Sequence, residues 1–238
     1  MAIRSVEADN AIRIVVEDVV VGEHVLHDDI LPSAGRCRSA TVSGMEAMSM
    51  SVDSLFVPAL TSLGGMVPQD GLLSPAELEK TAIEIAGRTE IWEPLMHSDP
   101  DHRRYELVYE DDRMDAWVLS WMPGQGTGFH DHYISGVGLC VATGSVREDL
   151  MVYGGEPRSL ELRAGDARQG GPGYIHRVTH ELGLPAVTIH VYSPRLDWVG
   201  QYRLGEDGLV RREVRPGRNE LTEQLIADGA LEQVLERF

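Results

Sequence analysis

The chain has 238 residues, of which 42% are hydrophobic and 25% charged, and its formal net charge is −17. The composition is ordinary for a soluble globular protein, and the length suffices for one sizeable domain, or one domain with an extension. The acidic balance excludes nucleic acid and anionic membranes as electrostatically attracted partners. No apolar run approaches roughly 18 residues, so we expect no membrane span.

The N-terminus and the cysteine content favour a cytoplasmic protein. Acidic residues interrupt the first 20 positions, which is not typical of a signal peptide. Cys37 and Cys140 are too few for a disulfide framework, so a reducing compartment is expected. Lys80, the single lysine, lies in an expected exposed helix, and we therefore discard lysine Schiff-base chemistry. The sequence indicates no oligomeric state.

Two helical segments are expected after an N-terminal extension. Residues 1–70 show weak periodicity, with a possible strand in "VEDVVVG", and we expect them to pack on the domain formed by residues 71–238. In "LLSPAELEKTAIEIAGR", Ser74 is a candidate N-cap, Pro75 the first helical residue and Glu77 the capping-box partner. A second short helix is expected in "EIWEPLM".

Residues 104–204 are rich in short β-type runs that Gly, Pro or acidic turns separate. This spacing is typical of a sandwich or barrel. A hairpin is expected in "GQYRLGEDGLVRREV", with a turn at Asp207-Gly208, followed by a helix from about Glu220 to Phe238. The β-type runs are "YELVYED", "AWVLSWM", "GVGLCVATG", "SVREDLMVYG", "SLELRAGD", "IHRVTHE" and "AVTIHVYSP".

A pair of histidines stands out in the stretch "GFHDHYISGVGLC". His130 and His132 alternate, so on a strand both imidazoles face the same side. Two buried imidazoles side by side need a compensating partner, and a metal ion is the simplest one. The pair therefore indicates part of a metal site.

The surrounding glycines complete a known pattern. The string G-x5-H-x-H-x11-G, from Gly124 to Gly144, resembles the first motif of the cupin barrels, with Val137 where many cupins carry a glutamate ligand. The second motif is matched by "GDARQGGPGYIHRVTH", which begins at Gly165 and supplies His176 as the third histidine. The resemblance implies a mainly β fold, a cupin double-stranded β-helix or jelly-roll-like barrel, with N-terminal helices and a C-terminal helix.

Three imidazoles without a carboxylate favour iron(II) as the metal. Neutral ligands leave a divalent ion with its full charge and open positions on one face, which suits binding of substrate and oxygen together. Zinc is the alternative, although a three-histidine zinc site usually keeps four-coordinate geometry and activates one water.

Three strings make the chain similar to the cysteine dioxygenase (thiol dioxygenase) family of cupins over residues 75–215. They are "WMPGQGTGFHDH", "YIHRV" and "PAVTIHVYSP". The resemblance implies that His130, His132 and His176 are the Fe(2+) ligands.

The last string implies the other site residues. Tyr192 matches the active-site tyrosine of the family, His190 the histidine that hydrogen-bonds to it, and Thr188 stands where the family usually has serine. Because these residues alternate on one expected strand, they face the same side. Ser193-Pro194 matches a pair that the family often holds in a cis peptide.

The chain departs from the family at two places. Animal relatives link a cysteine to the tyrosine, but Val137 occupies that position, so we expect no crosslink at Tyr192 and a core position for Cys140. The family also binds the substrate carboxylate with an arginine on an early strand. Of the two candidates in "HRRYELVYED", Arg103 and Arg104, we select Arg104. We interpret His180 and the remaining histidines as polar loop residues.

The resulting expectation is an iron thiol dioxygenase whose partners are O2 and a small thiol, most simply L-cysteine, which is converted to a sulfinic acid. Two alternatives stay open. The substrate is 3-mercaptopropionate or a specialised sulfur metabolite, or the chain is a non-catalytic metal-binding cupin that serves as a sensor.

Overall fold

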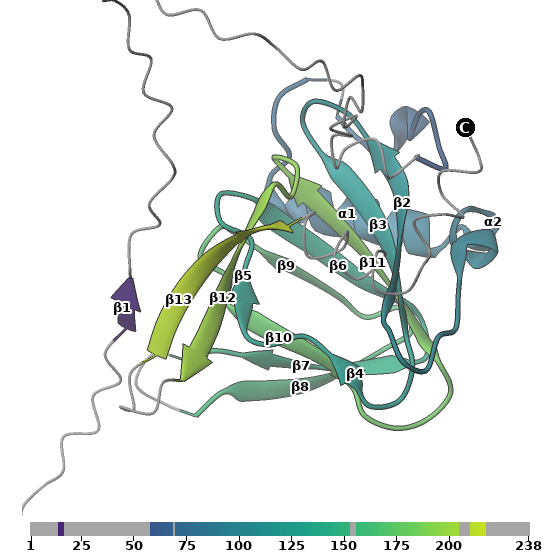
Figure 1. Cartoon of the computed structure of the whole chain (residues 1–238). Helices are drawn as coiled ribbons and strands as arrows, with labels where there is room; N and C mark the ends of the chain where they lie inside the picture. Colours follow the sequence, from purple (N-terminus) through teal and green to yellow (C-terminus); the bar gives the residue numbers. More distant parts are fainter. Residues whose placement is uncertain (1–13, 17–57, 69, 153–155, 205–209, 218–238) are drawn as a thin grey trace, which may run out of the picture.

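A computed structural model describes residues 14–16, 58–68, 70–152, 156–204 and 210–217. In this part of the chain two β-sheets face each other to form a barrel, and the helices lie outside one of them (Figure 1). No helix among the described residues is long and apolar enough to cross a membrane. The helices are α1 (Pro75–Ala86), α2 (Thr89–Trp92) and two 3-10 helices (Gly64–Met66 and Glu93–Leu95).

The larger sheet carries the C-terminal hairpin, β12 and β13, beside the short strand β5. Its order is β1-β13-β12-β5-β10-β7-β8, with β4 paired to β10. The strands are β1 (Ile14–Val16), β4 (Gln125–Gly126), β5 (His130–Asp131), β7 (Ser145–Leu150), β8 (Arg158–Arg163), β10 (His176–His180), β12 (Trp198–Leu204) and β13 (Val210–Pro216).

The smaller sheet is antiparallel and is buried on both faces around its central strand β11. Its order is β2-β3-β11-β6-β9. Every residue of β11 is buried, because the barrel interior covers one face and α1 the other. The strands are β2 (Arg104–Glu110), β3 (Asp115–Trp121), β6 (Gly136–Thr143), β9 (Ala167–Gly170) and β11 (Ala186–Ser193).

Helix α1 begins at a complete capping box and lies very close to the smaller sheet. The Ser74 side chain accepts a hydrogen bond from the Glu77 N–H, and the Glu77 carboxylate accepts one from the Ser74 N–H. A Cβ atom at Gly138 would lie 2.2 Å from the backbone of Leu78, so only glycine lets the helix approach β6 this closely.

The alternating pattern of β11 separates two apolar clusters. Ile189 and Val191 pack in the cluster under α1, whereas Tyr192 packs in the cluster between the sheets, with Leu139 and Trp121. Thr188 and His190 alternate with Ile189 and Val191 and therefore lie on the inner face of β11 with Tyr192.

The main expectations about the fold are confirmed. The fold is mainly β and cupin-like, the two expected N-terminal helical segments exist, and each of the seven expected β-type runs contains a strand. The expected hairpin is formed by β12 and β13, but its Asp207-Gly208 turn lies outside the described residues. So do the expected helix at 220–238 and most of the 1–70 extension. Of that extension, residues 58–68 pack on the barrel, with Leu60 hydrogen-bonded to β2.

Candidate metal centre

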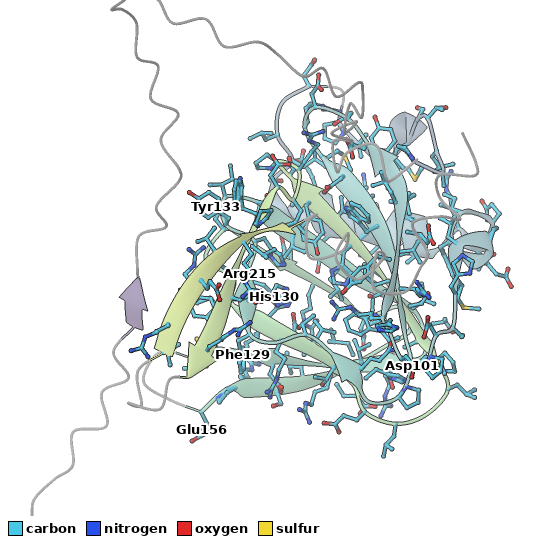
Figure 2. All side chains as sticks on the ribbon, viewed as in Figure 1. Asp101, Phe129, His130, Tyr133, Glu156 and Arg215 are labelled. Atoms are coloured by element: carbon cyan, nitrogen blue, oxygen red, sulfur yellow. The ribbon has the colours of Figure 1, made fainter. Side chains whose placement is uncertain are left out.

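Three histidines converge between the two sheets. His130 opens β5, His132 follows two residues later, and His176 opens β10. Their ring centroids lie 4.6 to 5.1 Å apart, and one nitrogen of each lies within 4.8 Å of the others. The register brings them together, since His176 lies directly opposite His130 in the β5–β10 pair. Figure 2 shows His130 pointing into the barrel beside the β12–β13 hairpin.

Acceptors of the protein set the tautomers of two imidazoles. His176 Nδ1 lies 2.8 Å from Oε1 of Glu148, and His130 Nδ1 lies 3.0 Å from the carbonyl oxygen of Gly128. A carboxylate and a carbonyl only accept, so both Nδ1 atoms carry the proton. A neutral imidazole with its proton on Nδ1 keeps a free lone pair on Nε2, which is the form that binds a metal, and this geometry presents that form at His130 and His176.

Several of these nitrogens are buried without a partner. Within the described ranges, no hydrogen bond reaches His176 Nε2 or either ring nitrogen of His132, and all three atoms are buried. An unsatisfied buried polar group costs roughly 1–3 kcal/mol. For His130 and His132 protonation is not an alternative, because burial and the neighbouring imidazoles lower the pKa of His130 to about 3 and that of His132 well below its usual value. The cluster therefore fits a divalent metal held by three imidazoles.

Asp131 anchors the turn between the two nearby histidines. Its carboxylate is buried and accepts hydrogen bonds from Arg212 at 2.6 and 2.7 Å, from the Tyr202 hydroxyl at 2.7 Å and from the Tyr133 N–H at 2.8 Å. Burial raises the pKa of Asp131, but the bonds from Arg212 and Tyr202 outweigh it, and the pKa lies below its usual value. This charged anchor holds Tyr133 at a φ of 57°, which is rare for a residue with a Cβ.

A chain of hydrogen bonds along β11 ends beside the histidine cluster. His190 Nδ1 lies 3.1 Å from the Tyr192 hydroxyl, and His190 Nε2 lies 3.0 Å from the Thr188 hydroxyl. Trp121 Nε1, on β3, donates to the same Thr188 oxygen at 2.8 Å. The Tyr192 ring centroid is 5.0 Å from that of His132, so the chain reaches the cluster.

The donor and acceptor roles of these groups fix the direction in which the hydrogen bonds run. Trp121 only donates, so Thr188 accepts from it, and the Thr188 proton goes to His190 Nε2, its other partner among the described residues. The His190 proton then lies on Nδ1 and is donated to the Tyr192 oxygen, which leaves the Tyr192 proton for a group in the cavity. Burial lowers the pKa of His190 and raises that of Tyr192, which keeps both groups neutral.

The cluster adjoins a cavity of about 320 Å³. His130, His132, His190 and Tyr192 all line it, and none of its described lining residues is acidic. A lining without acids around a metal ion favours an anionic ligand. The wall also contains Arg103, Tyr105, Trp121, Phe129, Leu196 and Gln201.

Arg103 and Arg104 point to different places. The Arg103 guanidinium carbon lies 4.6 Å from the ring centroid of Tyr105 and 4.9 Å from that of Trp121, both in the cavity wall. Arg104 forms an ion pair with Asp99 and does not line the cavity. The structure thus brings together the predicted histidines and Tyr192, with Thr188 behind them. Of the two candidate arginines, Arg103 lines the cavity, and the selected Arg104 does not.

Comparisons with known proteins decide the family. The sequence profile of the family described as "Cysteine dioxygenase type I" matches residues 81–204, which is more than half of the chain. The chain belongs to the cysteine dioxygenase type I family.

Solved structures of low similarity include several cupins. A cupin superfamily protein from Desulfitobacterium hafniense DCB-2 is 12% identical, with 53% of this chain and 94% of that chain covered and a TM-score of 0.37. A conserved protein with a double-stranded β-helix domain from Klebsiella pneumoniae is 20% identical, covering 43% of this chain and 85% of its own, with a TM-score of 0.39. A protein from Thermus thermophilus is 24% identical, covering 43% and 93%, also with a TM-score of 0.39.

This member of the cysteine dioxygenase type I family has no sulfur beside its tyrosine at the crosslink position. Val137 lies directly opposite Tyr192 in the β6–β11 pair, and both side chains belong to the inner cluster. Cys140 packs in the cluster under α1, as expected, and burial raises the pKa of its thiol to about 11. The peptide bond between Ser193 and Pro194 is cis.

The interpretation of His180 as a loop residue is wrong. His180 is the last residue of β10, is 2% exposed, and its Nδ1 donates to the carbonyl oxygen of Ser145 at 2.8 Å. Its burial follows from the pairing of β10 with β4 on one side and β7 on the other, which the sequence pattern did not reveal.

Sequence reasoning also missed Glu148, the acceptor for His176. One signal was present, since the alternation of Val146, Glu148 and Leu150 puts this carboxylate on the face of its apolar neighbours.

We predict that mild acid destabilises the metal-free protein through its buried histidines. His132 and His190 have pKa values well below the roughly 6.5 of an unfolded chain, so the unfolded state binds protons more tightly and the native state loses stability as the pH falls below that value. Between pH 7 and 5.5 the free energy of unfolding, measured by urea titration, should fall by about 1 kcal/mol for each such histidine.

The variant His190→Gln should reduce this fall by about 1 kcal/mol. The same fall in wild type and His190→Gln would contradict the prediction.

Proposed function

We propose that the protein is a non-haem iron(II) thiol dioxygenase. It adds both atoms of O2 to the sulfur of a small thiol, most simply L-cysteine, and the product is a sulfinic acid. The observation that carries the proposal is the cluster of three imidazoles, three of whose buried ring nitrogens have no partner among the described residues, beside a cavity whose described lining contains no acid. Membership of the cysteine dioxygenase type I family supports the same reaction.

His130, His132 and His176 are the residues that would hold the ion. When bound, iron(II) supplies the open coordination positions and the redox chemistry through which a thiol and O2 react. The reaction balances without another reductant, because the sulfur loses four electrons and the two oxygen atoms gain them. The three ligands are neutral, so an anionic thiolate is favoured at this centre.

Tyr192 is proposed to donate its hydroxyl proton to the reacting groups. The hydrogen bonds run from Trp121 through Thr188 and His190 to the Tyr192 oxygen, so the Tyr192 proton is free to point into the cavity. Because the donor is held in place before the substrate arrives, little reorganisation is needed when charge develops in the reaction. Thr188 and His190 act through Tyr192 as positioning residues.

Arg103 is proposed to bind the carboxylate of the substrate. Its guanidinium lies against Tyr105 and Trp121, which orient its plane in the cavity wall. A planar guanidinium binds a carboxylate with two parallel hydrogen bonds. A substrate with a thiolate at the metal and a carboxylate at Arg103 would place each of its anionic groups beside a positive group of this cavity.

A larger thiol acid is the second candidate substrate. The cavity volume of about 320 Å³ falls within the range of roughly 300–1,000 Å³ for pockets that hold drug-sized ligands. L-Cysteine has only seven non-hydrogen atoms, so this volume favours a specialised thiol acid over the smallest thiols.

We predict that iron-loaded protein consumes O2 when given a thiol acid and forms one sulfinic acid per O2. Oxygen uptake and mass spectrometry with ¹⁸O2 should be measured across L-cysteine, 3-mercaptopropionate and bulkier thiol acids, and two labelled atoms are expected in each product. The variant His176→Ala should lose iron and oxygen uptake together. If no thiol supports uptake and His176→Ala keeps full metal binding, the protein is a metal-binding sensor or another kind of cupin.

We predict opposite outcomes for two neighbouring arginines. Arg103→Gln should raise the KM for a carboxylate-bearing thiol by about 10- to 100-fold, because it removes charged hydrogen bonds worth roughly 1.5–3 kcal/mol. Arg104→Gln is the matched control and should change KM less than about twofold. The difference should disappear with a thiol that lacks a carboxylate, and a larger effect at Arg104 would refute the assignment.

A further inference from the structure

Glu148 is a fully buried acid in contact with one of the three histidines. Its side chain is 0% exposed, on β7. In the β7–β10 pair Glu148 lies opposite Val178 and Leu150 opposite His176, so Glu148 reaches His176 diagonally across the strands. Its Oε1 accepts hydrogen bonds from His176 Nδ1 and from the Tyr174 hydroxyl, each at 2.8 Å.

The charge of this carboxylate is only partly compensated by the protein. Glu148 Oε2 is buried and has no hydrogen-bond partner in the part of the chain that the structure describes. The cation paired with it is Arg168, whose Nε lies 3.7 Å from Oε2 and whose side chain is 35% exposed. An ion taken out of water costs several kcal/mol unless its pairing is excellent. A dication on the far side of His176 would complete the compensation.

Neither of the other two histidines has a charged partner of this kind. His130 donates to the carbonyl oxygen of Gly128, and His132 makes no hydrogen bond through its ring among the described residues. Val137 provides no carboxylate at the position where many cupins have a glutamate ligand. Among the described residues, His176 is therefore the member of the cluster whose ring is hydrogen-bonded to a carboxylate.

We propose that Glu148 is a positioning residue that tunes the metal centre through His176. It holds the imidazole proton on Nδ1, aims Nε2 at the metal and makes His176 a stronger donor, so that it supplies indirectly the charge that a glutamate ligand would supply directly. Arg168 opposes this effect by drawing charge toward Oε2. The proposal rests on the metal site of the proposed function, and it concerns how tightly the metal is held and how easily it is oxidised.

Tyr174 provides a means of separating hydrogen bonding from charge. Its hydroxyl donates to the same Glu148 oxygen as His176, and its ring centroid lies 5.0 Å from that of His176. The ring packs on Gly170, where a Cβ atom would lie 2.2 Å from it. Tyr174→Phe therefore removes one hydrogen bond from Glu148 but leaves the carboxylate and the packing in place.

The test compares four variants of the full chain with wild type, without thiol or O2. Glu148→Gln keeps the shape and removes the charge, and Arg168→Gln removes the opposing cation. Tyr174→Phe and the exposed Glu161→Gln serve as controls. The measurements are the Fe(II) dissociation constant by competition with a chromophoric chelator, the Fe(III)/Fe(II) midpoint potential, and the unfolding temperature of the metal-free protein.

We expect Glu148→Gln to bind Fe(II) about 10- to 100-fold more weakly and to have a more positive midpoint potential. Arg168→Gln should shift both quantities in the opposite direction, a sign that a structural role would not produce. Tyr174→Phe should have a smaller effect than Glu148→Gln, and Glu161→Gln should match wild type. The unfolding temperature of metal-free Glu148→Gln should not fall, since a buried charge has been removed.

An unchanged dissociation constant and potential in Glu148→Gln would overturn the proposal. If Glu148→Gln does not fold, Arg168→Gln tests the proposal. A midpoint potential of Arg168→Gln that is unchanged or more positive than that of wild type would then overturn it. The outcome is independent of the proposed reaction. Wild type that binds iron but consumes no O2 with any thiol would refute the dioxygenase, while the comparison of Glu148 variants would still stand.

Discussion

The constraint on which the structure depends is the burial of His132 and His176 beside His130, which leaves three ring nitrogens without a hydrogen-bond partner among the described residues. Burial keeps His130 and His132 neutral, as their lowered pKa values indicate. A dry environment with bare lone pairs is costly unless a cation occupies it. The barrel therefore has to hold the three rings in place, so that their nitrogens bind a metal ion and do not move together or bind water.

The rigidity comes from contacts outside the cluster. Pairing of β5 with β10 sets His130 opposite His176, and the Asp131–Arg212 ion pair ties the intervening turn to the C-terminal hairpin. On the smaller sheet, Trp121 orients the hydrogen-bond chain that ends at Tyr192. Helix α1 covers the outer face of that sheet at a distance that Gly138 makes possible. Each sheet therefore positions one half of the proposed active site.

Features that depend on local periodicity could be predicted from the sequence. The capping box at Ser74 marked α1, and alternation placed Thr188, His190 and Tyr192 on one face of β11. Features that depend on pairing between distant strands could not. His180 is buried only because β10 pairs with both β4 and β7, and these pairings leave no local trace.

Dependence on the pairing of distant strands also explains why the sequence led to Arg104 and did not reveal Glu148. Which of two adjacent arginines enters the cavity depends on how the start of β2 is oriented against β3, and the sequence alone does not show this. Glu148 lies in "SVREDL", where its neighbours Arg147 and Asp149 suggest a solvated strand. Strands of two residues, such as β5, are too short to show any period.

X-ray absorption at the iron edge, on iron-loaded protein before and after addition of a thiol acid, tests the central claim most directly. The account predicts three imidazole nitrogens around the iron in both states and a new sulfur neighbour at bonding distance after the thiol is added. The His176→Ala variant should lack this centre. An iron site with fewer than three imidazoles, or one that gains no sulfur with any thiol in the panel, would contradict the account.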